Sequence, residues 1–117
     1  GSIGSVLTKG WREEATLGQF RSVYGAAGTQ REACRAFYRQ GADRLISDLA
    51  AYLHRADAAG TLNIRHPRQA ADLFLSMFLG DGHIRGLLML DMPEAREDRA
   101  LLREAVRVFM AAYAKAP

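Results

Sequence analysis

The side chains that could perform chemistry are few and scattered in this chain of 117 residues. Its three histidines, His54, His66 and His83, do not recur at the spacing by which a helix presents two ligands to one metal ion. The single cysteine, Cys34, excludes an internal disulfide framework and a multi-cysteine metal site. The sequence contains neither a Gly-x-Ser-x-Gly nucleophile elbow nor a phosphate-binding loop. We therefore expect no catalytic residue, no metal and no cofactor, and a binding role instead of an enzymatic one.

The polar pair with the most informative spacing is Asp81 and Arg85. An acid four residues before a base favours an ion pair on one helix face. On a helical wheel Arg85 falls between Phe74 and Phe78, where a guanidinium could anchor an anionic ligand. The alternatives are an internal pair with Asp81 and an arginine that reaches solvent along its stem.

Aromatic residues could supply the wall of a pocket around these polar groups. Small-molecule sites are mostly apolar with a few polar anchors. The alternative is that the rings only fill the core. With Asp81 and Arg85, the predicted ligand-binding set comprises Phe20, Tyr24, Phe37, Tyr38, Phe74 and Phe78.

Helical periodicity dominates the elements that must position these residues. Apolar residues recur with a period near 3.6, and no segment alternates as a strand would over more than a few residues. Helices are expected over 6–27, as one or two pieces, and between 29 and 60, with Gly41 as a break or a kink. Two more are expected over 67–90, with Pro67 at the first position, and over 97–114. The predicted fold is an all-α bundle of four to six helices.

Composition limits the class of protein. A hydrophobic fraction of 49% with 25% charged residues is typical of one globular domain. The initial Gly1-Ser2 is typical of a tag remnant, so we assign 1–5 to a tag or disordered start and 6–117 to the domain. No apolar run reaches the ~20 residues of a membrane helix. The net charge of +3 comes from scattered arginines, which does not favour direct DNA contact.

The helix expected over 67–90 is apolar on two faces, with a narrow polar strip of Asp72, Ser76 and His83. The helix over 97–114 has an apolar arc wider than one packing partner needs. A chain this small cannot easily cover both, so we predict a homodimer whose interface contains two helices from each subunit. The predicted interface residues are Leu73, Met77, Gly80, Ile84, Leu88, Leu101, Ala105, Val108, Phe109 and Ala112.

A series of short motifs between 17 and 113 resembles a known family in order and spacing. The motifs are FYRQG (37–41), AAYL (50–53), RADAAG (55–60), AA (70–71), FL (74–75), GD (80–81) and HIRGLL (83–88). Together they resemble the C-terminal regulatory domain of TetR-family transcriptional repressors, of the AefR-like branch.

The resemblance implies an effector-sensing and dimerisation domain of a bacterial, cytoplasmic protein. Its partners would be a second copy of itself and a small apolar or amphipathic ligand. Operator DNA would be bound only through an N-terminal helix-turn-helix that this chain does not contain, whether through trimming, proteolysis or a relative without that domain. The alternative is a helical dimerisation or adaptor module with a packed interior. A cavity of several hundred cubic ångströms would distinguish a sensor from such a module.

Overall fold

The computed structural model describes residues 10–115, and these form an all-α fold, as predicted. The described residues contain one isolated β-bridge, which joins Leu62 to Ala114. The predicted boundary of the domain at residue 5 lies outside the described residues. The elements are α2 (Glu14–Gly25), α3 (Arg31–Tyr38), the π-helical stretch η2 (Arg39–Asp43), α4 (Arg44–Ala58), α5 (Pro67–Leu87) and α6 (Ala95–Tyr113).

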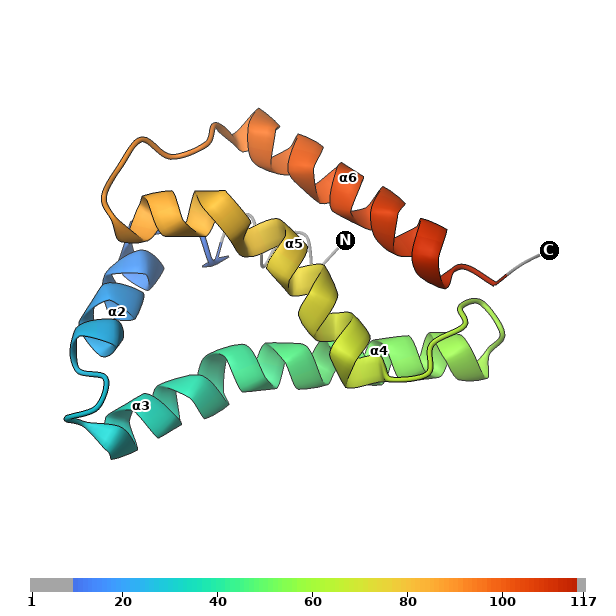
Figure 1. The fold of residues 1–117 in the computed structure, drawn as a ribbon, viewed down its shortest axis with the longest axis horizontal. Coiled ribbons are helices and arrows are strands. Elements are labelled where there is room, and N and C mark those ends of the chain that lie inside the picture. Colours follow the sequence, from blue (N-terminus) through green and yellow to red (C-terminus); the bar gives the residue numbers. More distant parts are fainter. Residues whose placement is uncertain (1–9, 116–117) are drawn as a thin grey trace.

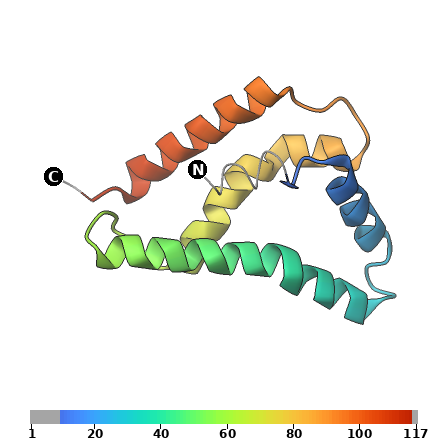
Figure 2. The same cartoon turned by 180° about the vertical axis from the view of Figure 1, so that it is seen from behind.

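The helices form a flat frame (Figure 1). Viewed from behind, α3, η2 and α4 form one continuous long edge of the frame (Figure 2). Gly41 lies in the π-helical stretch η2 and does not break this long helix. Helix α5 packs against α2, α4 and α6. The extents are 49 × 33 × 19 Å and the radius of gyration is 15.5 Å. A compact domain of this length would have a radius of about 13 Å, so the fold is unusually open.

The core lies where α5 crosses α4 and meets α6. Burying each large apolar side chain there contributes roughly 1.5–3 kcal/mol. Ala105 and Phe109 belong to this core, with 3% and 7% of their surfaces exposed, so their prediction as dimer contacts is wrong. The arc of α6 is wide because one part of it packs against α5 of the same chain. The core residues are Leu49, Leu53, Leu62, Ile64, Ala70, Ala71, Phe74, Leu75, Phe78, Ala105 and Phe109.

Helix α5 contains a kink at Gly80, whose φ of 24° and ψ of −134° are not helical. Only glycine adopts such a conformation without strain. The kink changes the direction of the second half of the helix, so a single helical wheel cannot place residues on both sides of it. The space around its Cβ position within this chain is open.

Candidate functional site

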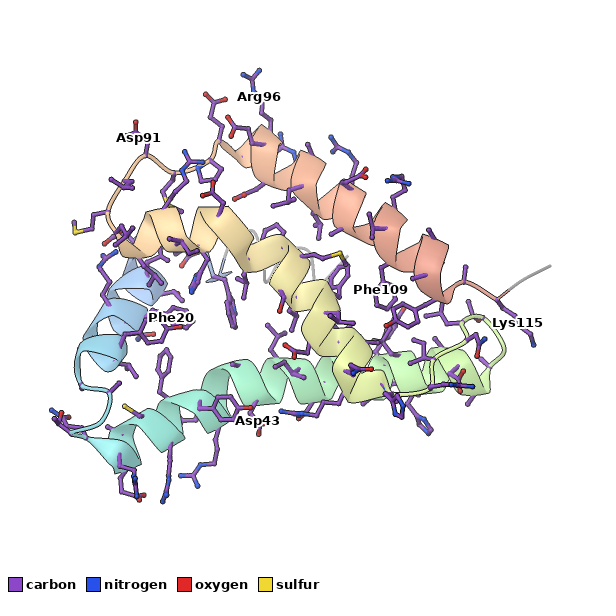
Figure 3. The ribbon with its side chains drawn as sticks, in the orientation of Figure 1. Phe20, Asp43, Asp91, Arg96, Phe109 and Lys115 are labelled. Carbon is purple, nitrogen blue, oxygen red and sulfur yellow. The ribbon has the colours of Figure 1, made fainter. Side chains whose placement is uncertain are left out.

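An aromatic cluster joins α2, α3 and the second half of α5. Phe20 lies at its centre and faces the interior of the frame (Figure 3). Its ring centroid is 5.1 Å from that of Phe37 and 4.9 Å from that of His83, both edge-to-face. Trp11 and Tyr24 contact the same ring at 5.3 and 5.8 Å. Each such pair contributes about 0.5–1.5 kcal/mol beyond burial, so these five residues, here called the aromatic cluster, stabilise the corner of the frame.

His83 is the polar member of the aromatic cluster. Burial, and then the positive charge of Arg12, lower the pKa of His83 below its ordinary value of 6.5. Its Nδ1 atom is buried and has no hydrogen-bond partner among residues 10–115. The helical wheel placed His83 on a polar strip with Ser76, and this is wrong because the kink at Gly80 lies between them. The glycines on either side of Asp81 were the signal that could have warned of it.

The predicted ligand-binding residues do not share one pocket. Phe20, Tyr24 and Phe37 meet in the aromatic cluster, whereas Phe74 packs edge-to-face on Phe109, with ring centroids 5.5 Å apart. Phe78 is fully buried.

Tyr38 is half-exposed on the long edge of the frame, where its hydroxyl accepts a hydrogen bond from Arg68 at 3.3 Å. Tyr24 is also half-exposed. A residue in the wall of a closed pocket would be largely buried, and neither tyrosine is.

An ion pair joins Asp81 to Arg85, which is one of the alternatives that the sequence left open, with 3.6 Å between Oδ2 and Nη1. Asp81 is exposed, and Arg85 lines a hollow with Met77 and Leu101 beside α6. The prediction that Arg85 lies between Phe74 and Phe78 is wrong, again because the kink intervenes.

A half-open apolar groove of about 350 Å³ lies between α4 and α6, with Phe74 of α5 in its wall. Phe74 is the one member of the predicted ligand-binding set that lines it. Sequence reasoning missed this groove because its two walls are about fifty residues apart along the chain. Its lining residues are Leu49, Tyr52, Leu53, Ala56, Thr61, Leu62, Phe74, Leu102, Val106, Phe109 and Met110.

The outer faces of α5 and α6 carry exposed apolar side chains. Exposed apolar side chains that together form a contiguous patch mark interaction surfaces. Met77 of α5 and Leu101 of α6 line one shared hollow, so the two helices lie next to each other at this point. The apolar α5–α6 surface, as the term is used below, consists of the exposed or half-buried residues Leu73, Met77, Gly80, Ile84, Leu88, Leu101, Val108 and Ala112.

Residues 10–115 contain no group of three or more histidine, cysteine, aspartate or glutamate side chains able to hold a metal ion. In the same part of the chain, no helix has the length and apolar character that crossing a bilayer requires.

The helical frame places the chain in the class of all-α domains. The family model of the AefR-like transcriptional repressor, C-terminal domain, matches residues 2–115, and the chain belongs to this family of TetR-type regulators.

Two solved structures have the same fold. One is a protein from Mesorhizobium loti assigned to the TetR-family transcriptional regulators, with a TM-score of 0.83 and 18% identity over 97% of this chain. The other is the flavonoid-responsive regulator FrrA, with a TM-score of 0.73 and 25% identity over 81% of this chain. The matched regions span 65% and 48% of those proteins. A search of curated proteins found no significant match.

Proposed function

We propose that this chain is the effector-sensing and dimerisation domain of a cytoplasmic TetR-family repressor. It binds a small apolar or amphipathic molecule in the groove between α4 and α6, and it forms a homodimer through the apolar α5–α6 surface. Operator DNA is bound by an N-terminal domain that is not in this chain. The observation that carries the proposal is the apolar groove of about 350 Å³.

The groove suits a flat apolar ligand. Its volume is at the lower end of the range of about 300–1,000 Å³ for small-molecule sites. Tyr52, Phe74 and Phe109 supply aromatic rings, and Thr61 and the Tyr52 hydroxyl supply the polar side-chain groups. The similar regulator FrrA is described as flavonoid-responsive, which supports a planar aromatic compound as the class of ligand. A fully packed adaptor module would have no need of such a groove.

Helix α6 connects the two proposed sites. Val106 lines the groove, whereas Val108 lies on the apolar α5–α6 surface. A ligand that prefers one position of α6 therefore changes the surface presented to the partner subunit. Such coupling between sites typically amounts to about 1–3 kcal/mol and is reciprocal.

Two matched substitutions separate ligand binding from dimerisation. Val106 and Val108 are on the same helix and are 44% and 40% exposed. We expect Val106→Glu to weaken binding of unsubstituted flavone and of the fluorescent probe anilinonaphthalene sulfonate by more than about tenfold, because a carboxylate is costly to desolvate. The same variant should leave the dimer intact.

Val108→Glu should have the opposite effect, because it places two like charges near each other at an isologous interface. Fluorescence titration measures ligand binding and sedimentation velocity measures the dimer. Loss of both properties in both variants, with unchanged helical circular dichroism, would contradict the assignment of two distinct sites. A wild-type chain that binds neither probe would contradict the sensor proposal itself.

A further inference from the structure

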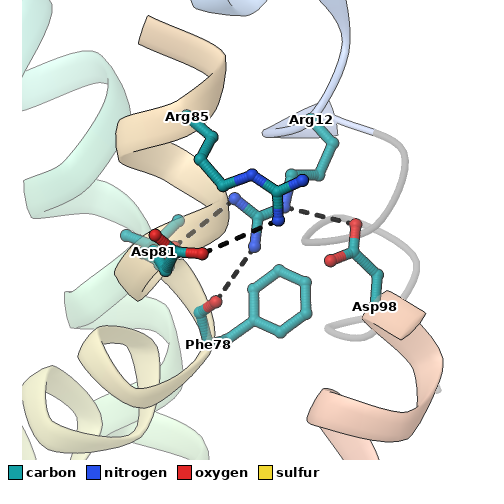
Figure 4. Close-up of polar contacts among 6 residues, drawn as sticks. Arg12, Phe78, Asp81, Arg85 and Asp98 are labelled. Carbon is teal, nitrogen blue, oxygen red and sulfur yellow. Dashed lines mark hydrogen bonds and ion pairs between the residues drawn. The ribbon is translucent and has the colours of Figure 1, made fainter. Parts of the chain in front are cut away.

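The buried guanidinium of Arg12 is the least expected feature of this fold. Only 6% of its side chain is exposed. Its Nη2 donates to the carbonyl of Phe78 at 3.1 Å and its Nη1 to that of Leu79 at 3.4 Å. Its Nε lies 3.3 Å from Oδ2 of Asp98 in the first turn of α6, a carboxylate whose side chain is 8% exposed. Figure 4 shows this arrangement between α5 and α6.

The contacts of Arg12 centre on the kink of α5. The two carbonyls that it binds belong to the residues immediately before Gly80. The guanidinium carbon also lies 4.9 Å from the ring centroid of Phe78, within cation–π distance.

Gly82 provides the space for this guanidinium. A Cβ atom at position 82 would lie 2.5 Å from Nη2 of Arg12. One side chain therefore depends on two nearby features of α5: the non-helical backbone at Gly80 and the missing side chain at Gly82.

The neighbouring residue contacts the same part of α5. Trp11 packs on Phe20 and His83 of the aromatic cluster, and His83 directly follows Gly82. The segment before α2 thus contacts the second half of α5 through two consecutive side chains. Since α5 and α6 also carry the apolar α5–α6 surface, this segment is joined to both the aromatic cluster and that surface.

We propose that Arg12 is a positioning residue that holds α5 kinked at Gly80. It thereby sets the orientation of Ile84 and Leu88 relative to Leu73 and Met77 on the apolar α5–α6 surface. The effect on dimerisation rests on the proposed function, whereas the effect on the kink does not.

A double-mutant cycle between Arg12 and Gly82 tests the effect on the kink. Gly82→Ala should lower the urea midpoint of unfolding when Arg12 is present, because the new methyl group displaces the guanidinium. In the Arg12→Ala background the same change should raise the midpoint, because alanine favours helix. Gly18→Ala, at a position where a Cβ has room, is the control and should raise the midpoint in both backgrounds. Additive effects of the two substitutions would overturn the proposal.

Fluorescence of Trp11, the only tryptophan in the chain, reports the docking of the same segment. Arg12→Ala should shift its emission to longer wavelength and increase acrylamide quenching at unchanged circular dichroism. Arg12→Lys should recover the wild-type emission and quenching of Trp11 only in part, because an ammonium group lacks the planar fork that reaches separate acceptors. Full restoration by lysine would show that charge alone suffices and would overturn the positioning role.

Sedimentation velocity tests the consequence for the subunit surface. Arg12→Ala should weaken the dimer by about tenfold, as expected for coupled contacts. Arg68→Ala, which removes an exposed arginine paired with Asp43, is the control and should not change it. A dimer unchanged by Arg12→Ala would overturn the link between the kink and the surface. A monomeric wild-type chain would contradict the proposed function and, with it, that link, while the cycle and the fluorescence would still decide the role at the kink.

Discussion

The buried ion pair between Arg12 and Asp98 makes a quantitative prediction about stability. Asp98→Asn keeps the shape of the side chain and an oxygen acceptor but removes the negative charge. The guanidinium then stays buried without a counter-charge, since only 6% of the Arg12 side chain is exposed. We expect a large loss of folding free energy from this one exchange of an oxygen for a nitrogen.

The structure sets the expected size of the loss. Breaking a buried ion pair by removing one partner costs about 3–5 kcal/mol. Arg12 retains the carbonyls of Phe78 and Leu79 as acceptors, so we expect the lower end, about 3 kcal/mol. At about 4 °C per kcal/mol for a domain of this size, the melting temperature falls by about 12 °C. Replacing both partners, as Arg12→Met with Asp98→Leu, should cost less, about 1 kcal/mol, because no buried charge remains and only carbonyl partners are lost.

Urea unfolding followed by circular dichroism measures these free energies. Glu104→Gln is the control, because it removes the charge from an exposed pair with Arg107 and should produce no measurable change. A loss below about 1 kcal/mol for Asp98→Asn would mean that water reaches the pair as it reaches a surface ion pair, and the reasoning would be refuted.

Two further predictions concern α5. Gly80→Ala should destabilise the domain by about 1–3 kcal/mol in urea unfolding through backbone strain alone, because a Cβ there has open space. A gain in stability would contradict the strained geometry at Gly80. Because the pKa of His83 is lowered, the unfolded chain takes up a proton near pH 6.5 that the folded chain resists. Stability should therefore fall as pH falls below about 6.5, and His83→Gln should flatten this slope. His54→Gln, at an exposed position, should leave the slope unchanged. An unchanged slope in His83→Gln would contradict the assignment of this pH dependence to His83.

The sequence was sufficient to predict the all-α fold and the helices α5 and α6, and it offered the Asp81–Arg85 pair as one alternative for these two residues. Each depends on local periodicity or on residues four positions apart, which a single helix determines. The order of short motifs was sufficient to indicate the family. These features could be predicted because none of them depends on how distant segments of the chain contact each other.

Features that depend on the kink or on distant contacts could not be predicted. One helical wheel assumes continuous helical geometry, so it misplaced Arg85 and His83 beyond Gly80. The width of the apolar arc on α6 did not reveal that Phe109 faces the same chain. Arg12 lies about seventy residues before its carbonyl partners, and no pattern in the sequence points to that contact.

The position of a bound ligand tests the central claim most directly. We would record nuclear Overhauser effects between unsubstituted flavone and a chain labelled at its methionine, leucine, isoleucine and valine methyl groups. The account predicts contacts from flavone to the methyl groups of Val106 and Met110, which line the groove. Contacts to Val23, beside the aromatic cluster in α2, in place of those two would put the ligand elsewhere and contradict the groove as the effector site.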